Sequence, residues 1–190
     1  KDKSYYFENN KENIKFLKRL FENPEIKKVG FNIKEQIKSL RKHGINDIVN
    51  IFDVSIAHYL LQADMRHDLE VLSENYLDYS CLDIQTTLGK GKNKRNFSEL
   101  SEDKKKFYTC ELADVQLQLS EIFEKQLTEL NLIELFYKIE MPLLKVLSEM
   151  ELEGINLDVE MLNNFSAELT TDIKNLEQDK EMMDFFNYIR

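Results

Sequence analysis

Residues that interrupt regular structure are scarce in this chain, and their scarcity is the strongest limit on its fold. Five glycines and two prolines occur among 190 residues. Helices can therefore run long, and each interrupting residue marks an expected joint between elements. We expect a mainly helical protein whose elements end near these joints. The glycines are Gly30, Gly44, Gly89, Gly91 and Gly154.

Two amphipathic helices are predicted near the N-terminus. Apolar residues at three- and four-residue spacing mark the first over residues 10–23, and Pro24 follows where that helix should have ended. Asn32 can cap a second helix, which Gly44 stops. Each helix has one apolar face that can be buried in a core.

Two short strands are predicted beside these helices. Residues 27–31 can form a short strand, and residues 48–52 are a run rich in β-branched and aromatic residues, as in a buried strand. Asp53 follows this run directly and can cap a helix that extends toward Gln62. Strands alternating with helices indicate a helix-rich α/β fold.

The middle of the chain is predicted to be helical on both sides of an exposed loop. A helix is expected over residues 68–77, and a longer one begins at Ser101, with an apolar face that runs from Val115 to Leu130. Between them, residues 89–95 are basic and contain two glycines, which indicates a loop in solvent.

The last third of the chain has a different pattern. Two apolar stripes at helical spacing, over residues 139–150 and 162–176, are separated by Gly154 and predict a helical pair. Pro142 suits the first turn of the first of these helices. Residues 180–190 match no motif, and their even apolar character indicates packing rather than chemistry.

Composition and charge restrict the function classes. Apolar residues make up 42% and charged residues 32%, as in folded globular proteins. The net charge of −9 argues against free-standing nucleic-acid binding, which relies on Lys and Arg. No apolar run approaches a signal peptide or the roughly 20 residues of a membrane span, so we expect no membrane partner. Cys81 and Cys110 fit neither a metal-ligand spacing nor a disulfide framework, which favours a reducing cytoplasm.

Three stretches of the sequence, taken in order, carry a resemblance to a known family. They are Asn23 to Lys34; Phe52-Asp53, Arg66-His67-Asp68-Leu69, Gly89-Lys90-Gly91-Lys92-Asn93 and Tyr108 with Ala113-Asp114-Val115; and Ile139-Glu140-Met141-Pro142-Leu143 with Met150-Glu151 and Gly154. Together they span roughly residues 22–170 at near-family spacing and resemble the family A DNA polymerases of the bacterial DNA polymerase I type.

The resemblance implies a specific fold and domain organisation. Residues 1–137 would form a ribonuclease-H-like 3′–5′ exonuclease domain, and residues 138–190 the helical start of the polymerase thumb. It also implies an incomplete protein, since in the family a strand with an Asp-x-Glu pair comes earlier and the palm and fingers follow. The implied parent is a polymerase that uses Mg²⁺ and binds DNA primer-template, with the palm and fingers as partners in the same chain.

The exonuclease positions implied by the resemblance are altered. The family holds two divalent metals with converging carboxylates. An aspartate is implied where Gln36 stands, and another where Leu112 stands, while Tyr108 keeps the family's aromatic position. We therefore expect a degenerate site without metal, and no cofactor in these residues.

Two neighbouring acidic residues are candidates to bind a metal in place of the missing aspartates. Glu35 and Glu111 each precede an altered position by one residue. One residue turns a helical side chain by about 100°, so both are expected to point away from the site. Leu112 is expected on the buried stripe of its helix with Val115 and Leu119. Tyr108 is expected to be a packed aromatic residue.

Other candidate residues have a structural interpretation beside a functional one. Asp53 is either a metal ligand or, by preference, a helix cap, and Asp114 either a ligand or an exposed helical carboxylate. His43, His58 and His67 are scattered without ligand spacing, and the Arg-His-Asp run around His67 favours a structural role.

The basic loop has two interpretations as well. Its cations could follow a phosphate backbone, or they could simply be solvated, since the chain is acidic overall and the loop lacks interleaved aromatics. The candidate nucleic-acid-binding residues are Lys90, Lys92, Lys94 and Arg95.

The leading hypothesis from the sequence is a structural, catalytically inactive exonuclease-like module of a replication and repair DNA polymerase in the bacterial cytoplasm. Two alternatives remain. One is an active metal-dependent 3′–5′ exonuclease, and the other is a non-enzymatic helical module that binds a protein partner.

Overall fold

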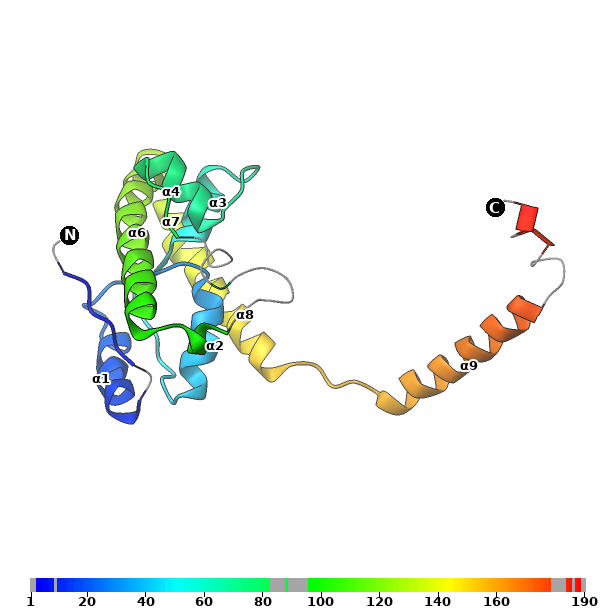
Figure 1. The fold of residues 1–190 in the computed structure, drawn as a ribbon. Helices are drawn as coiled ribbons and strands as arrows, with labels where there is room; N and C mark the ends of the chain where they lie inside the picture. Colours follow the sequence, from blue (N-terminus) through cyan, green and yellow to red (C-terminus); the bar gives the residue numbers. More distant parts are fainter. Residues whose placement is uncertain are drawn as a thin grey trace. The chain divides into compact units, whose positions relative to one another are not determined.

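The structure is a computed structural model that describes residues 3–8, 10–82, 88, 96–178, 184–185 and 187–188. The chain divides into two compact units, Lys1–Leu152 and Glu153–Arg190. Figure 1 shows its helices and strands along the chain.

The first unit begins with two helices and a pair of strands. Helix α1 spans Lys11–Phe21, and the Asn10 side chain caps it by accepting the Asn13 N–H at 2.9 Å. Strand β1 (Lys28–Gly30) precedes helix α2 (Ile33–Lys42), and strand β2 (Ile51–Asp53) follows it. The two strands pair in parallel, as expected for strands joined through a helix, with Gly30 opposite Asp53.

The remaining helices of the first unit follow the strands along the chain, and α3 and α6 contact them. Helix α3 (Val54–Leu61) follows β2 without a gap, and α4 (Leu69–Leu77) comes next. A short turn, η2 (Phe97–Glu99), leads into α6 (Glu102–Glu129). The chain then continues through α7 (Ile133–Leu135), the π-helical η3 (Phe136–Glu140) and α8 (Met141–Glu153). Helix α6 packs against α3, α4 and β1, and in Figure 1 it runs beside α4.

The core lies between the strand pair and α6. The ring centroids of Phe52 and Phe136 lie 4.7 Å apart, and both residues are fully buried. At the edge of this core, Glu124 accepts hydrogen bonds from Lys27 at 2.6 Å and from Tyr137 at 2.7 Å. Burial and the bond to Glu124 raise the pKa of the Tyr137 phenol. The side chains of Lys27, Glu124 and Tyr137 therefore link the residue before β1 with α6 and η3.

Most of the predicted elements are confirmed, with local differences. The second strand lies at Ile51–Asp53, at the end of the run over residues 48–52. Leu130 was expected on the apolar face of α6, but its side chain is 59% exposed, because the helix ends at Glu129 and Leu130 is its C-cap. Leu127 is the last buried residue of that face.

Helix α8 buries a different face from its most apolar one. Met141, Leu144 and Ser148 are buried. The apolar stripe predicted from the sequence lies on the exposed side. It consists of Ile139, Leu143, Val146, Leu147 and Met150.

The second unit contains α9 (Val159–Gln178), and Asp158 caps it by accepting the Met161 N–H at 2.9 Å. None of its residues is buried. The predicted stripe is present on this helix and is exposed: Leu162, Phe165, Leu169, Ile173 and Leu176. Among the described residues, no helix combines the length and the apolar character that crossing a membrane requires.

Candidate functional site

Asp53 holds the two strand-to-helix junctions of the first unit together. Its Oδ2 accepts the N–H of Ile33, the first residue of α2, at 2.7 Å. Its Oδ1 accepts the N–H groups of Ser55 and Ile56 in the first turn of α3, at 2.9 and 3.3 Å. Only 1% of Asp53 is exposed. Burial raises the pKa of this carboxyl, and the N–H donors oppose that shift.

This geometry decides the role of Asp53. Both of its oxygens accept backbone N–H groups from helix starts, where unpaired donors and the helix dipole favour a carboxylate. The predicted helix cap is confirmed, and the same residue also caps α2. Asn32, which was expected to cap α2, adopts a left-handed conformation at φ 53° and makes no capping bond with its side chain. Asp53 supplies that bond instead.

Gln36 lies on the first turns of α2, one turn beyond this junction. Its Nε2 donates a hydrogen bond to the Phe31 carbonyl at 2.8 Å, and its side chain is exposed. The amide therefore ties α2 to the segment between β1 and the helix. The Gln36 amide is neutral and therefore supplies no negative charge for binding a cation.

Tyr108 and Leu112 lie one turn apart on α6. Tyr108 is buried, and its ring lies 6.0 Å from that of Phe97 in η2. Leu112 is half-buried and packs against the core cluster, on the same face of the helix as Val115 and Leu119. Both structural expectations, a packed aromatic ring and an apolar core residue, are confirmed.

The two neighbouring acids are engaged elsewhere. Glu35 is exposed and pairs with Lys38 at 2.7 Å on the same helix. Glu111 accepts a hydrogen bond from the Tyr79 hydroxyl at 2.5 Å and one from the Leu82 N–H at 3.2 Å. Glu111 thus fastens the segment after α4 to α6. The hydroxyl bond to Glu111 also raises the pKa of Tyr79.

The fold has two parallel strands, a junction where Asp53 caps two helices, and a long helix packed against the strands. A comparison with known protein families agrees with this fold. Residues 3–128 match a family described as a 3′–5′ exonuclease of DNA polymerase A. The chain belongs to this exonuclease family. Its helix-rich α/β fold is the one that the sequence predicted.

Relatives of this exonuclease-family chain are bacterial polymerases. It is 38% identical over 150 residues to DNA polymerase I of Borreliella burgdorferi, covering 78% of this chain and 16% of that protein. It is 31% identical over 164 residues to DNA polymerase I of Rhizobium leguminosarum, covering 86% and 16%. The chain thus spans about a sixth of the length of these relatives.

A solved structure has the same fold. The chain is similar, with a TM-score of 0.69 and 21% identity, to a structure described as the POL domain of Pol1 from M. smegmatis in complex with DNA primer-template and dNTP. The match covers 88% of this chain and 26% of that one.

At the two positions where the resemblance implies metal-binding aspartates, the side chains present do not fit a divalent metal site. Gln36 offers a neutral amide, Leu112 offers no oxygen, and Glu111 is bound to Tyr79 and Leu82. Hard cations need several carboxylate or carbonyl oxygens around one point. Within the described ranges, no group of three or more His, Cys, Asp or Glu side chains has the geometry to hold a metal ion.

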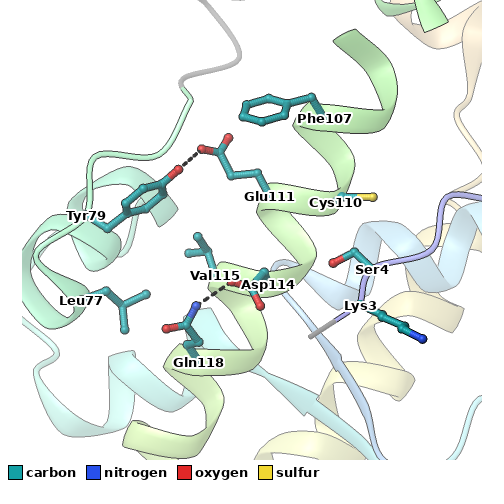
Figure 2. Close-up of a pocket in the computed structure, with 10 residues that line it drawn as sticks. All are labelled: Lys3, Ser4, Leu77, Tyr79, Phe107, Cys110, Glu111, Asp114, Val115 and Gln118. Carbon is teal, nitrogen blue, oxygen red and sulfur yellow. Dashed lines mark hydrogen bonds between the residues drawn. The ribbon is translucent and has the colours of Figure 1, made fainter. Parts of the chain in front are cut away.

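A cleft of about 610 Å³ lies beside α6 (Figure 2). Phe107, Glu111 and Asp114 of α6 line it, opposite Tyr79 at the end of α4. Asp114 was predicted to be exposed, and this is wrong. It is half-buried in the cleft and accepts a hydrogen bond from the Gln118 amide at 2.7 Å. The i to i+4 spacing on α6 accounts for that pairing.

Two histidines that the sequence placed far apart meet in the fold. His58 of α3 and His67, which precedes α4, lie with their Nδ1 atoms 2.7 Å apart. The expectation that the histidines are scattered is therefore wrong for this pair. The two are nine positions apart in sequence, and the segment between α3 and α4 brings them together. A nine-residue spacing carries no signal of such a contact.

The basic loop, with Lys90, Lys92, Lys94 and Arg95, lies outside the described residues, as does most of the segment 180–190. Both interpretations of this loop, contact with a phosphate backbone and simple solvation, therefore stay predictions.

Proposed function

We propose that this chain is a catalytically inactive, structural exonuclease-like module of a bacterial DNA polymerase I. The observation that carries the proposal is the pair Gln36 and Leu112. Each stands where the family resemblance implies a metal-binding aspartate. One is an amide bonded to a backbone carbonyl, and the other is an apolar side chain packed against the core.

In this proposal the domains keep the limits predicted from the sequence. Residues 1–137 are the exonuclease-like domain, and residues 138–190 begin the thumb. The exonuclease-like domain supports the thumb and palm of the parent enzyme, which binds DNA primer-template and uses Mg²⁺ in the bacterial cytoplasm. Support for this arrangement comes from the polymerase relatives, which are several times longer than this chain.

The test uses the intact polymerase that contains this chain, with end-labelled single-stranded DNA and either Mg²⁺ or Mn²⁺. We expect primer extension without 3′–5′ degradation. If degradation occurs and disappears on Glu35→Gln or Glu111→Gln, the proposal is wrong. Glu12→Gln, an exposed glutamate on α1, is the matched control, and thermal melts must show that each variant is folded.

An active exonuclease is the first alternative and makes its own prediction. Its metals would bind these residues together with the Asp-x-Glu pair that the resemblance places earlier, so isothermal titration of the intact polymerase with Mn²⁺ should show saturable heat that Glu35→Gln or Glu111→Gln removes. Under our proposal, both altered positions lack charge and no such heat appears. This measurement does not depend on the polymerase activity of the parent.

A helical protein-interaction module is the second alternative, favoured by the exposed apolar stripes on α8 and α9. The simplest discriminating observation is the reading frame beyond Arg190. A frame that continues into polymerase palm sequence supports our proposal, and a stop codon soon after Arg190 supports the interaction module.

A further inference from the structure

An imidazole pair, one ring buried and one half-buried, joins α3 to the segment before α4. His58 is 2% exposed, while His67 is half-buried. Their Nδ1 atoms lie 2.7 Å apart, and the other nitrogen of His58, Nε2, lies 3.2 Å from the Tyr76 hydroxyl of α4. The Phe123 ring of α6 packs 5.4 Å from the His58 ring and keeps this side apolar. His58 therefore has both ring nitrogens in contact with polar partners.

The short distance between the Nδ1 atoms limits how many protons the pair can hold. A hydrogen bond between two imidazoles needs one N–H and one lone pair. When both rings are neutral, one Nδ1 donates and the other accepts. With one extra proton on the pair, burial keeps His58 neutral, and the Nδ1–H of His67 donates to the His58 Nδ1. His58 in that state keeps its own proton on Nε2 and donates it to Tyr76.

A second proton cannot be accommodated without breaking the contact. It would have to bind His58 Nδ1, the atom that already accepts the hydrogen bond. Two N–H groups would then face each other across 2.7 Å, and two positive charges would lie side by side in a partly apolar site. The contact is therefore compatible with one proton fewer than two unfolded histidines can bind.

The surroundings offer little to stabilise a charged His58. From α3 comes Tyr59, whose ring lies 5.9 Å from that of His67. From α4 comes Tyr76, and from α6 Phe123. The charged groups next to His67 in sequence, Arg66 and Asp68, pair with each other at 2.7 Å. Burial lowers the pKa of His58, and the charge of His67 lowers it further.

We propose that His58 and His67 form an acid-sensitive latch between α3 and the segment that leads into α4. The latch is closed while the pair holds at most one extra proton, and it opens when both imidazoles are charged. The latch affects more than the turn between α3 and α4. Helix α4 packs on α6 and is followed by Tyr79, whose hydroxyl donates a hydrogen bond to Glu111. Opening the latch loosens α4 and the wall of the cleft that it supplies.

The direct test is an NMR measurement on the isotopically labelled, unaltered chain. At about pH 8, above the ordinary histidine pKa of about 6.5, a scalar coupling should connect the two Nδ1 nuclei across the hydrogen bond. At about pH 5 this coupling should vanish. His58 should titrate below its counterpart in an unfolded peptide of the same sequence. A coupling that is absent at about pH 8 overturns the latch.

The second test measures proton uptake on unfolding. Because the pKa of His58 is lowered in the folded state, its stabilising contribution is complete above about pH 6.5 and is lost as pH falls below that value. Between this value and the lowered folded pKa of His58, the unfolding equilibrium constant should rise by up to about tenfold per pH unit as pH falls. In the His58→Gln and His67→Gln variants, the unfolding equilibrium constant should rise less steeply as pH falls. The difference from the unaltered chain should be up to about one factor of ten per pH unit.

His43→Gln is the control for removing a histidine, since His43 lies at the end of α2 and outside the pair. It should leave the pH slope of the latch in place. If the buried His58→Gln variant does not fold, His67→Gln on the half-buried partner still decides the matter. A slope in His67→Gln equal to that of the unaltered chain overturns the proposal.

Discussion

At Asp53 a single buried carboxylate accepts backbone N–H groups at the starts of two helices. The Ile33 N–H lies 2.7 Å from one oxygen, and the Ser55 N–H lies 2.9 Å from the other. Removing the carboxylate would leave donors at both helix starts without their partner. This is a costlier loss than that of an ordinary cap, because the site is buried.

Asp53→Ala should therefore lower the free energy of unfolding by about 2–4 kcal/mol, the sum of two caps. Asn10→Ala is the matched control. Asn10 caps only α1, through one exposed bond to Asn13, and its loss should cost about 1 kcal/mol. Urea unfolding of both variants measures the difference. Equal losses would show that the second cap adds nothing.

Gly30 illustrates a steric limit at the residue scale. A Cβ on Gly30 would lie 2.8 Å from Cγ1 of the buried Ile33 and 3.1 Å from Oε1 of Gln36. Real Cβ atoms do not approach so closely, so the first turn of α2 would have to move.

Gly30→Ala should cost about 1–3 kcal/mol in the free energy of unfolding because of this overpacking. The cost should be smaller when Ile33 has already been changed to Ala, because that change removes the clashing carbon. A double-mutant cycle by urea unfolding measures this coupling. Additive losses would contradict the steric explanation.

At the scale of elements, α2 and α8 are joined by side chains of opposite charge. Lys34 and Lys38 both contact Glu151, each at 2.6 Å, and Arg41 contacts Glu149 at 2.6 Å. The three cations recur at helical spacing along one face of α2. The hydrogen bonds from Lys34 and then Lys38 hold the pKa of Glu151 below its usual range.

Glu151→Gln should reduce stability at neutral pH, with a smaller loss at about 1 M than at about 0.01 M salt because the ions screen exposed charges. Because the pKa of Glu151 is lowered in the folded state, its carboxylate stabilises the fold at pH values above the unfolded pKa of 4.5. This stabilisation is lost as pH falls through the folded pKa. The variant should therefore lose less stability on acidification below about pH 4.5. Thermal melts at two salt concentrations and several pH values test both effects.

Glu134→Gln is the control for these melts, because Glu134 pairs with Lys138 within one helical stretch and joins no separate elements. Its effect on stability should be the smaller one. An equal effect of the two variants would mean that the α2–α8 contacts add nothing beyond ordinary surface pairs.

At the scale of the whole molecule, the chain consists of two units that differ in kind. Among the described residues, the core cluster lies in the first unit, whereas α9 in the second has no buried residue. Most of the stability of a protein helix comes from packing of its apolar face rather than from helix propensity.

Residues 1–152 alone should therefore unfold with nearly the same urea midpoint as the full chain. Residues 153–190 as a peptide should be only partly helical, and helicity should rise with concentration as the exposed stripe associates. Circular dichroism measures both. A large loss of stability in the shorter chain would show that the second unit stabilises the first.

Much of this molecule could be predicted from its sequence, because its main signals are local. Helical periodicity and the few breakers placed α1, α2, α4 and α6, and Asp53 after an apolar run predicted a cap. That Gln36 and Leu112 replace metal-binding aspartates is implied by a resemblance in residue order and stays a prediction. Leu112 also followed from the apolar spacing of its helix.

Contacts between distant residues were decided by the tertiary structure alone. Packing brought His67 to His58, placed Asp114 in a cleft, and let Asp53 cap a second helix in place of Asn32. It also chose which face of α8 is buried. Periodicity reports that a helix has an apolar face, but burial depends on what the rest of the chain brings against it.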